Sequence, residues 1–338
     1  MIRFFENHSL KQHNTFGIDA KAKFFFEFTE PQDLTEFLEA NQSWREEKLI
    51  VLGEGSNVLF LNDFDGLVIH PKVPGITSVY EDRHNEWFEV GAGEIWDEFV
   101  QHAVTLGVGG IENLSLIPGL VGAAPVQNIG AYGQEVCAVI EKVKGYDLEK
   151  GAPAEYSVEE CKFAYRNSIF KSYLKNKFII TSVIFKLDKF PEFNLKYGQL
   201  DEKVKEMGEV NLRNIRKSVV EIRESKLPDT NELGSAGSFF KNPQVENAHV
   251  KKLKSKYPGI PIYKGENDTS KLAAGWLIEQ AGWKGKRIGD AGVHEQQALV
   301  LVNYGKASGS EIYSLSEKIR QAVKDKFGVE LEREVNCI

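Results

Sequence analysis

Three polar residues, far apart along the chain, have side chains that could stabilise a negative charge and then protonate it. Ser238 lies in the string SAGSFFKNP, Arg166 in YRNS and Glu334 in LEREV. A guanidinium is permanently charged and can bind a carboxylate through two parallel hydrogen bonds. A buried carboxyl has a raised pKa and, once protonated, can donate a hydrogen bond to an enolate. A serine hydroxyl can protonate a strongly basic carbanion where the site excludes competing water.

The local patterns around these residues are also typical of ordinary structural roles. Ser238 stands before two phenylalanines and could be a loop hydroxyl beside core aromatics. Arg166 has the pattern of a surface arginine. Glu334 alternates with Val335, in phase with Glu330 and Glu332, which is typical of the solvated face of a strand. The residue types alone therefore leave both interpretations open.

Two glycine-rich segments about sixty residues apart together predict a bound dinucleotide. The string GEGSN (53–57) follows an apolar strand, but Val58 replaces the third glycine of the dinucleotide fingerprint, which argues against a Rossmann site. Its backbone N–H groups can still approach a diphosphate closely. The string IPGLVGAAPVQNIGAYG (117–133), here called the glycine loop, is long and uncharged, as expected of backbone lying against a flavin. Taken singly, the first segment could be a hairpin turn and the second a buried structural loop.

The composition excludes several classes of protein. The chain has 338 residues, is 42% hydrophobic and has a net charge of −7, which fits two or three domains and argues against nucleic-acid or anionic-membrane binding. Its three cysteines are widely separated without a CxxC motif, so we expect a reducing compartment, no disulfide framework and no metal site. Charges interrupt the N-terminal residues, and no apolar run approaches the roughly 18 residues of a membrane span. We therefore expect a cytoplasmic protein without a signal peptide.

Hydrophobic periodicity predicts a mixture of strands and helices, hence an α+β fold. Strands are expected at 23–28, 48–52, 58–61, 87–93, 143–157 (as a hairpin), 177–187, 297–302 and 329–335. Helices are expected at 31–38, 95–104, 215–222, 270–282 and 308–328, with a short one beginning at Ser157. Seven glycines within residues 107–133 argue against regular structure there.

The same pattern predicts three segments of the chain. Residues 1–187 form a nucleotide-type region in two subdomains that divide near residue 66. Residues 188–212 form a linker with a tyrosine in it, and residues 213–330 form a second domain. The last strand, 329–338, could pack back on the first region.

Several strings resemble one enzyme family. LGEGSNVLF and the glycine loop resemble the two FAD-contacting segments of the vanillyl-alcohol-oxidase/PCMH-type flavoprotein fold. FAYRNSIFK, SKLPD, AGSFFKNP, KLAAGWLIEQAG and LEREV narrow the resemblance to the UDP-N-acetylenolpyruvoylglucosamine reductases, and LKYGQL resembles the tyrosine-bearing loop of their longer subclass. The resemblance runs in order over nearly the whole chain. One departure is Glu54, where small residues are common, and repulsion from a diphosphate should turn its side chain away.

The resemblance implies an NADPH-dependent oxidoreductase with FAD. The FAD would be non-covalent, because residues 115–133 contain no His or Cys for a covalent link. In the implied reaction NADPH reduces the flavin, hydride passes to C3 of the enolpyruvyl group of UDP-N-acetylglucosamine enolpyruvate, and C2 is protonated. The product, UDP-N-acetylmuramate, is a precursor of peptidoglycan and so serves cell-wall synthesis, cell shape and cell division. The implied fold is a two-part FAD-binding region (1–187) with a C-terminal α+β substrate-binding domain (213–330), in a cytoplasmic monomer.

The resemblance also implies roles residue by residue. Arg166 and Glu334 would stabilise the enolate, and Ser238 would protonate C2. The residues that would contact the UDP part are Tyr197, Lys226, Asn242 and Gln297, with Gln296 as an alternative to its neighbour. The residues that would contact FAD are Gly53, Gly55, Ser56, Asn57, Gly119, Gly122, Asn128 and Gly130.

Two other functions fit parts of the sequence. A hydroxy-acid or alcohol oxidase on the same flavin fold would not need Lys226, Asn242 and Tyr197 for a UDP group. A non-catalytic nucleotide-sugar sensor would not need the three catalytic residues. His294 is interpreted as a hydrogen-bonded structural histidine rather than a base.

Overall fold

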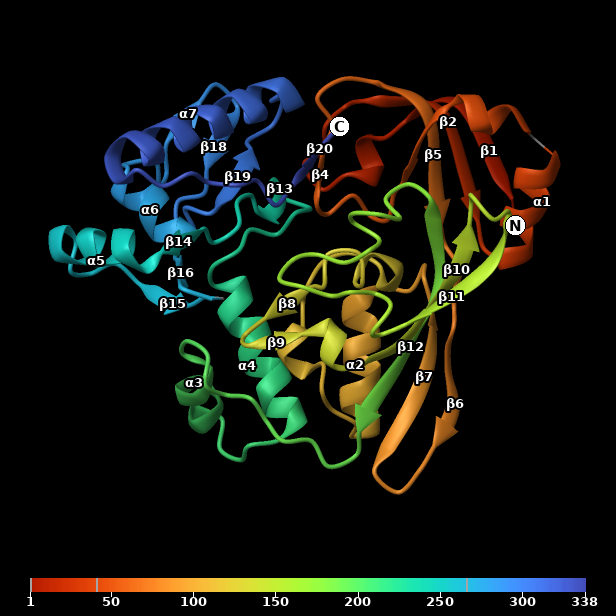
Figure 1. Cartoon of the computed structure of the whole chain (residues 1–338), viewed down its shortest axis with the longest axis horizontal. Coiled ribbons are helices and arrows are strands. Elements are labelled where there is room, and N and C mark those ends of the chain that lie inside the picture. The colour runs from red at the N-terminus through yellow and green to blue at the C-terminus, as the bar shows by residue number, and fades with distance from the viewer. Residues whose placement is uncertain (1, 41, 266) are drawn as a thin grey trace. The chain divides into compact units, whose positions relative to one another are not determined.

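The computed structural model describes residues 2–40, 42–265 and 267–338, which form two compact units (Figure 1). Unit 1 comprises Met1–His8, Ala22–Glu54 and Asp65–Ser225, and unit 2 comprises Ser9–Lys21, Gly55–Phe64 and Lys226–Ile338. The sequence predicted a boundary within 188–212, whereas the compact units divide after Ser225. The reason is that helices α3 (Leu200–Glu206) and α4 (Leu212–Glu224) share a hydrophobic cluster to which Tyr132 of the glycine loop contributes.

The first sheet of unit 1 has four strands in the order β1-β2-β5-β3. Their bounds are Arg3–Ser9 (β1), Lys21–Phe28 (β2), Lys48–Val51 (β3) and Phe64–Pro71 (β5). Strands β3 and β5 are parallel. Helix α1 (Pro31–Ala40) and the 3-10 helix η2 (Gln42–Glu46) connect β2 to β3, and Phe37 of α1 stacks on Phe26 of β2 with ring centroids 3.8 Å apart.

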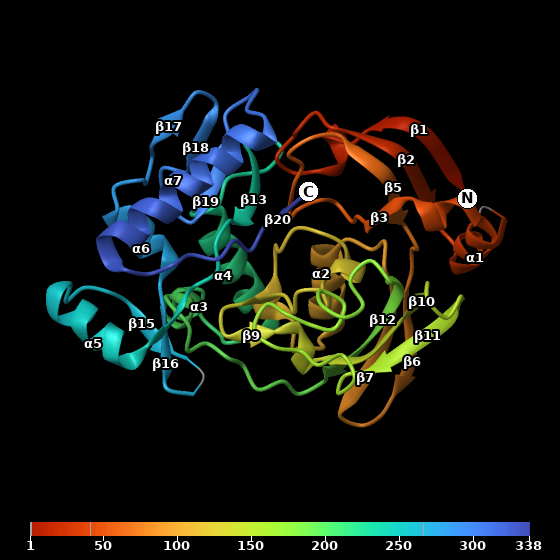
Figure 2. The ribbon, with the colours of Figure 1, turned by 45° about the horizontal axis from the view of Figure 1, so that its top comes forward.

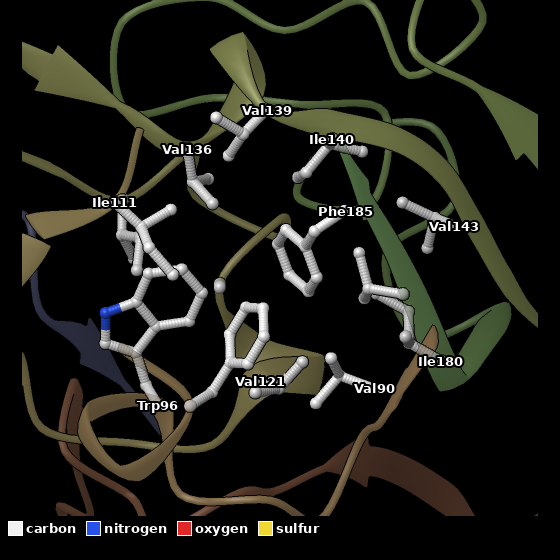
Figure 3. Close-up of a cluster of buried hydrophobic side chains, with 14 of the residues drawn as sticks. Val90, Trp96, Ile111, Val121, Val136, Val139, Ile140, Val143, Ile180 and Phe185 are labelled. Carbon is white, nitrogen blue, oxygen red and sulfur yellow. The ribbon is translucent and has the colours of Figure 1, made fainter. Parts of the chain in front are cut away.

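The second sheet of unit 1 is antiparallel, with strand order β11-β10-β12-β7-β6. Its strands are Ile76–Glu81 (β6), Asn85–Gly91 (β7), Ile140–Asp147 (β10), Ala152–Ser157 (β11) and Phe178–Asp188 (β12). Helix α2 (Trp96–Leu106) buries its apolar stripe against this sheet, and Trp96 faces Phe185 of β12 in the core (Figure 3). Gly107 ends the helix in the left-handed conformation that glycine adopts without strain. The predicted strands, hairpin and helix of this region are confirmed.

The glycine-rich stretch 107–133, all of which the structure describes, contains only short elements. These are the 3-10 helices η3 (Glu112–Leu114) and η4 (Val121–Ala123) and strand β8 (Gly130–Ala131). Strand β8 pairs with β9 (Gln134–Glu135), and the 3-10 helix η5 (Val136–Ala138) follows. The prediction that regular structure fails here is confirmed.

Unit 2 contains a four-stranded sheet, β13-β19-β18-β17 (Figure 2), and a three-stranded sheet, β14-β16-β15 (Figure 1). The strands are Gly234–Ser238 (β13), Gln244–Glu246 (β14), Ile262–Lys264 (β15), Thr269–Leu272 (β16), Arg287–Ile288 (β17), Ala291–Val293 (β18) and Val300–Asn303 (β19). The helices are Asn247–Lys256 (α5), Ala274–Gln280 (α6) and Gly309–Phe327 (α7). Helix α7 packs on β18, β19 and α6. As predicted, a capping box of Ser308 and Glu311 begins α7, and Gly328 ends it.

Two early segments of the chain belong to unit 2. One carries the 3-10 helix η1 (Lys11–His13), and the other carries β4 (Val58–Leu59), which pairs in parallel with β20 (Asn336–Cys337). The C-terminal segment therefore pairs with residues that the sequence analysis assigned to the first region. The predicted strand at 58–61 is shorter than expected, with two residues in the ladder.

Two predicted elements are wrong because contacts distant in sequence outweigh the local pattern. The predicted helix at 270–282 begins only at Ala274, because Thr269–Leu272 forms β16 between β14 and β15. The predicted strand at 329–335 is irregular, and its one bridge joins Arg333 to Phe240. The charged residues that produced the alternating pattern, Glu330 and Glu332, instead pair with Lys324 and Lys241.

The short helix predicted after Ser157 is also wrong. Ser157 and Glu160 do form both hydrogen bonds of a capping box. However, Lys162 adopts φ +45°, a left-handed conformation that turns the chain out of a helix after one turn. The predicted strand at 297–302 likewise starts late, at Val300, because its N–H donates to Gln297 C=O in a turn.

We predict that Gly309→Ala destabilises the protein by about 2 kcal/mol, as overpacking of a tight contact does. A Cβ at Gly309 would lie 1.7 Å from Phe60 C=O, which follows β4 directly. The matched control is Gly259→Ala, whose new Cβ would meet no atom within 4 Å. Urea denaturation checks the prediction, and equal midpoints for the two variants would contradict it.

Candidate active site

The glycine loop of unit 1 packs tightly against the segment that leads into α2. Gly122 N–H donates to Ala92 C=O at 3.0 Å, and a Cβ at Gly122 would lie 2.7 Å from Ala92 Cβ. Trp96 N–H donates to Gly119 C=O, where φ is +119°. Glycine is therefore required at 122 because the backbone lies too close to Ala92 for a Cβ. At 119 it is required because φ is positive.

Three non-glycine residues in or next to this loop adopt left-handed conformations, which is uncommon for residues with a side chain. They are Leu116 (φ +57°), Asn128 (φ +46°) and Tyr132 (φ +47°). Each of their carbonyl groups accepts a hydrogen bond from a side chain outside the loop; the donors, in order, are Arg223, Arg166 and Asn113. Such clustered strain is typical of functional sites.

The two glycine-rich segments meet within unit 1, as a dinucleotide site requires. A Cβ at Gly53 would lie 3.7 Å from the side chain of Leu120 in the glycine loop. In the described part of the chain, the N–H groups of Gly53 and Glu54 have no hydrogen-bond acceptor. Unpaired backbone donors on a glycine turn can bind phosphate oxygens. This backbone, and the absence of charged side chains from the glycine loop, fit FAD.

The second half of the first glycine segment belongs to unit 2. Gly55 adopts φ +63°, and a Cβ there would lie 2.2 Å from His13 C=O. Ser56 and Asn57 follow in a turn, and Asn57 C=O accepts from the backbone and side chain of Asn336. Glycine at 55 therefore lets this turn pack on the segment around His13.

Arg166 in unit 1 lies with its guanidinium against the glycine loop. Its Nη2 donates to Gly130 C=O at 2.6 Å and its Nη1 to Asn128 C=O at 3.4 Å. A Cβ at Gly130 would lie 2.9 Å from Nη1, so glycine leaves the room that the guanidinium occupies. The Arg166 guanidinium also lies over the Tyr165 ring, 5.3 Å from its centroid. These contacts fix a cation beside the proposed flavin-binding backbone.

Asn128 supports this arrangement from inside unit 1. Its side chain is fully buried, donates to Glu135 and to Ala164 C=O, and accepts from Cys137 N–H. The bond to Ala164 holds the turn that carries Arg166. Direct contact between Asn128 and FAD stays a prediction.

A network of charged residues, which the sequence did not indicate, holds Leu116 directly before the glycine loop. Asp97 of α2 pairs with Arg216 of α4 through two bonds of 2.6 and 2.8 Å, and it accepts from Leu116 N–H. Burial opposes ionisation of Asp97, but the bonds from Arg216 and Leu116 outweigh it and lower the pKa of this carboxyl. Arg223 donates to Leu116 C=O, so both peptide groups of Leu116 are held by charged side chains.

Arg223 is a half-buried cation without an ion-pair partner in the described chain. Burial lowers its pKa, while Tyr132 and Asp97 oppose the shift. Burial also raises the pKa of the Tyr132 hydroxyl. A buried guanidinium with donors to spare can bind an anionic ligand. In the sequence, Arg223 is marked only by its position, three residues before Lys226 in the last turn of an amphipathic helix.

Tyr197 lies on the exposed tip of the segment between β12 and α3. The side chain is 43% exposed, and its ring meets the Tyr132 ring edge-on with centroids 6.3 Å apart. The predicted tyrosine therefore lies next to the glycine loop within unit 1.

Ser238 is the last residue of β13 in unit 2 and is exposed. Gly237 before it adopts φ +65°, and a bulge between Ser235 and Ser238 shifts the register with β19. Phe239 and Phe240 after it are fully buried and meet edge-on. The two phenylalanines are thus core residues, and the bulged strand end presents the serine hydroxyl at the surface of the unit.

Glu334 lies beside Ser238 in unit 2. Its N–H donates to Phe239 C=O at 2.9 Å, and Asn57 Nδ2 reaches Glu334 C=O at 3.3 Å. Glu334 is half-buried, whereas Glu330 and Glu332 are exposed and paired with lysines. The solvated face predicted by the alternating pattern therefore holds for those two glutamates, while Glu334 is placed differently.

The other proposed UDP contacts of unit 2 lie near the start of α6. Asn242 Oδ1 accepts from Ala274 N–H at 2.9 Å, and Gln297 Oε1 would lie 3.1 Å from a Cβ at Gly275. Gln297 is half-buried and Gln296 is exposed. Lys226 is exposed at the first residue of the C-terminal segment.

His294 accepts a hydrogen bond at Nδ1 from Gln297 N–H, and burial lowers its pKa, with Glu295 opposing the shift. A neutral ring that accepts from the backbone fits the structural role expected for this histidine.

Comparison with known proteins identifies related sequences over the whole chain. Residues 22–151 match the family model of an FAD binding domain, and residues 229–338 match that of the UDP-N-acetylenolpyruvoylglucosamine reductase C-terminal domain. The UDP-N-acetylenolpyruvoylglucosamine reductase of Flavobacterium johnsoniae is 46% identical over 335 residues and 98% of both chains. The reductase of Pseudomonas putida is 45% identical over 99% of both chains. The chain belongs to the UDP-N-acetylenolpyruvoylglucosamine reductase family.

The fold supports the same assignment. The crystal structure of UDP-N-acetylenolpyruvylglucosamine reductase from Thermus caldophilus matches with a TM-score of 0.68 and 26% identity, covering 100% of this chain and 98% of that one. The predicted α+β fold with an FAD-binding region is confirmed. As a member of this family, the chain is an FAD-dependent oxidoreductase.

Within the described residues, no helix is both long and apolar enough to cross a membrane. The same residues contain no group of three His, Cys, Asp or Glu side chains that could hold a metal ion.

We predict that Asp97→Asn destabilises this reductase-family protein by about 2 kcal/mol at pH 7, because it weakens a charge-assisted pair. The pKa of Asp97 is lowered in the folded state. Its contribution is therefore complete above the unfolded value of about 4 and is lost as the pH falls through the lower folded value. Urea midpoints measured from pH 7 to pH 3 should converge for the wild type and the variant in acid.

The control is Glu98→Gln on the same turn of α2, because Glu98 is exposed and forms no ion pair in the described chain. A difference between Asp97→Asn and the wild type that stays constant down to pH 3 would refute the ionic role.

Proposed function

We propose that the chain reduces UDP-N-acetylglucosamine enolpyruvate to UDP-N-acetylmuramate with NADPH, the reaction of its family, and that Arg166, Ser238 and Glu334 are its catalytic residues. FAD, when bound by the two glycine-rich segments, would supply the hydride chemistry between NADPH and C3 of the enolpyruvyl group. The observation that carries the residue assignment is the backbone bond between Glu334 and Phe239, which sets Glu334 beside Ser238. This pairing supports two acids acting on neighbouring atoms of one substrate.

The backbone of both glycine-rich segments holds FAD without a covalent link. The residues proposed to contact FAD are Gly53, Gly55, Ser56, Asn57, Gly119, Gly122, Asn128 and Gly130. The N–H groups of Gly53 and Glu54, which have no acceptor in the described chain, support this assignment. The side chain of Glu54 turns away from the diphosphate, because two negative groups repel.

Arg166 and Glu334 act on the substrate carboxylate and on the charge that develops next to it. When hydride reaches C3, negative charge spreads over C2 and the carboxylate. A fixed guanidinium stabilises that charge without having to reorganise, because Gly130 and Asn128 already orient it. A protonated Glu334 donates a hydrogen bond to the same enolate.

Ser238 donates its hydroxyl proton to C2, which completes the lactyl ether and leaves an alkoxide that water reprotonates. Ser238 is exposed at the end of β13, after the left-handed Gly237 and the bulge of this strand. The reaction thus adds one hydride at C3 and one proton at C2, and no group leaves.

Lysine, arginine and amide side chains bind the UDP part. We assign this role to Lys226, Asn242, Gln297 and Tyr197, with Tyr197 on the loop that marks the longer subclass. Arg223 of unit 1 is a further candidate for an anionic ligand, because its half-buried guanidinium donates only through Nε within the described chain. The enzyme acts as a cytoplasmic monomer in peptidoglycan precursor synthesis, without nucleic-acid or membrane partners.

A hydroxy-acid or alcohol oxidase on the same fold is the alternative enzyme, and a UDP-sugar sensor is the alternative without catalysis. The purified protein should be yellow, and anaerobic NADPH should bleach the flavin. Adding the UDP substrate should then restore the colour with formation of UDP-N-acetylmuramate. Rapid NADPH oxidation by oxygen without the UDP sugar would favour an oxidase, and a protein without flavin would favour a sensor.

We predict that Ser238→Ala keeps flavin reduction by NADPH but lowers product formation by about 10²- to 10⁴-fold, the range typical of general acid catalysis. Ser238→Cys retains a proton donor and should restore part of the rate. Ser235→Ala, on the same strand, is the control and should keep full turnover. Stopped-flow measurement of both half-reactions checks this, and undiminished reoxidation of the flavin by substrate in Ser238→Ala would rule out the proton-donor role.

A further inference from the structure

Asn113, in the 3-10 helix η3 of unit 1, joins two segments that are far apart in sequence. Its Nδ2 donates to Tyr132 C=O at 2.9 Å and to Asn194 C=O at 2.8 Å. Tyr132 belongs to the glycine loop, and Asn194 lies three residues before Tyr197. Asn113 is 2% exposed, so both bonds form in the interior of the unit.

The orientation of the Asn113 amide is decided by these two bonds. If the amide were turned over, its oxygen would face two carbonyl oxygens. In the observed orientation Oδ1 is buried without a partner in the described chain. A buried acceptor left unpaired destabilises a fold by about 1–3 kcal/mol. The fold tolerates this loss, which indicates that the two donor bonds matter more than complete pairing of the side chain.

The 3-10 helix that carries Asn113 is fixed on both sides. Trp96 Nε1 donates to Leu114 C=O at 2.9 Å, and Glu112 accepts from Gly110 N–H at 2.6 Å. The Ser115 hydroxyl donates to Glu112 C=O at 2.6 Å. The donor group of Asn113 is therefore held in place before any ligand binds.

The segment before Tyr197 is anchored at several points in unit 1. A Cβ at Gly109 would lie 2.6 Å from Pro191 Cγ, which shows how closely the chain packs there. Phe193 and Leu195 pack on the hydrophobic cluster of α3 and α4. Asn194 Nδ2 donates back to Gly133 C=O at 3.0 Å. Residues 191–195 thus form a fixed base, here called the loop base.

The tip beyond this base, residues 196–199, is exposed. Gly198 in the tip adopts φ +62°. The Asn194 side chain accepts from Lys196 N–H at 3.4 Å, where the tip begins. Only a short tip with Tyr197 in it is therefore left to adapt to a ligand.

We propose that Asn113 is a positioning residue that fixes the loop base to the glycine loop, and thereby places Tyr197 for binding of the UDP substrate. The proposal rests on the substrate-binding role of Tyr197 given under Proposed function. With the base fixed at Asn194, the loop loses little conformational freedom when Tyr197 engages a diphosphate. Without it, the whole segment from residue 191 would have to be ordered on binding.

Asn113→Asp tests this, because it keeps the shape of the side chain and removes both donors. We expect about a tenfold increase in the KM for UDP-N-acetylglucosamine enolpyruvate, with kcat and anaerobic flavin reduction by NADPH changed less than about twofold. Asn194→Ala, at a half-buried surface position, removes the reciprocal bond to Gly133 and should raise the same KM to a smaller extent. This second variant keeps the test valid if Asn113→Asp fails to fold.

The matched control is Asn303→Asp in unit 2. Asn303 is 6% exposed and its Nδ2 also donates to two carbonyl groups, of Phe16 and Ala307. Loss of those bonds should lower the urea midpoint without changing the KM for the UDP substrate. If Asn113→Asp behaves like Asn303→Asp, with lower stability and unchanged KM, Asn113 is only structural and the proposal is wrong.

A double-mutant cycle with Tyr197→Ala tests whether Asn113 acts through Tyr197. In the Tyr197→Ala background, Asn113→Asp should raise KM less than about twofold further. If the fold-increases in KM of the two single variants multiply in the double variant, the proposal is wrong. If Tyr197→Ala itself leaves KM unchanged, both the role of Tyr197 and this proposal fail, while wild-type turnover in the same assay reports separately on the proposed reaction.

Discussion

Left-handed backbone at Leu116, Asn128 and Tyr132 is the constraint on which the candidate site of unit 1 depends. For a residue with a Cβ this conformation costs roughly 1–2 kcal/mol. At each position a side chain from outside the loop donates to the carbonyl of the strained residue. At Leu116 and Asn128 the donor is a guanidinium, and a hydrogen bond from a charged group contributes about 1.5–3 kcal/mol, which is enough to offset the strain. At Tyr132 the donor is the neutral Asn113 amide, whose bond contributes about 0.5–1.5 kcal/mol and offsets part of it. The path of the glycine loop thus depends on polar side chains that lie elsewhere in the sequence.

The same hydrogen bonds also orient the donors, because a side chain that donates to the loop is itself fixed by that contact. Arg166 is oriented by Gly130 and Asn128, and Arg223 is oriented by Leu116. Each guanidinium uses part of its donor set on backbone and is fixed close to the loop. A cation oriented in this way does not have to reorganise when an anionic ligand arrives, which is the main requirement for electrostatic stabilisation of charge.

The sequence predicts the parts of this site that depend on backbone freedom. Glycines at 55 and 122 indicate close approach, and the structure shows it at both, since a Cβ would lie 2.2 Å from His13 C=O and 2.7 Å from Ala92 Cβ. The capping box of Ser308 and most strands are likewise local signals. The start of α6 is not predictable, because β16 forms only through pairing with β14 and β15.

The supporting side chains carry even less signal in the sequence. Asp97 follows a tryptophan at the start of an amphipathic helix. Its sequence position indicates only an acidic side chain exposed to solvent in the first turn. Asn113 lies in ENLSL, where an amide has no local partner. Asn113 donates to carbonyl groups 19 and 81 residues away in the chain. Asp97 accepts from Leu116 N–H, 19 residues away, and from Arg216, 119 residues away, so only the folded structure reveals these roles. The family resemblance supplies the reacting residues but not the side chains that hold their surroundings.

Within unit 2, one chain segment links the proposed flavin-binding and catalytic roles. Asn57 follows the first glycine turn, and its Nδ2 donates to the carbonyl of Glu334. Glu334 N–H in turn donates to Phe239, next to Ser238. The glycine turn, Glu334 and the end of β13 are therefore joined by consecutive hydrogen bonds. Glu334 takes part in both links through its backbone groups, so neither link uses its side-chain carboxyl. The end of β13 and the irregular segment that carries Glu334 are thus joined by the backbone, which suits the two proposed acids.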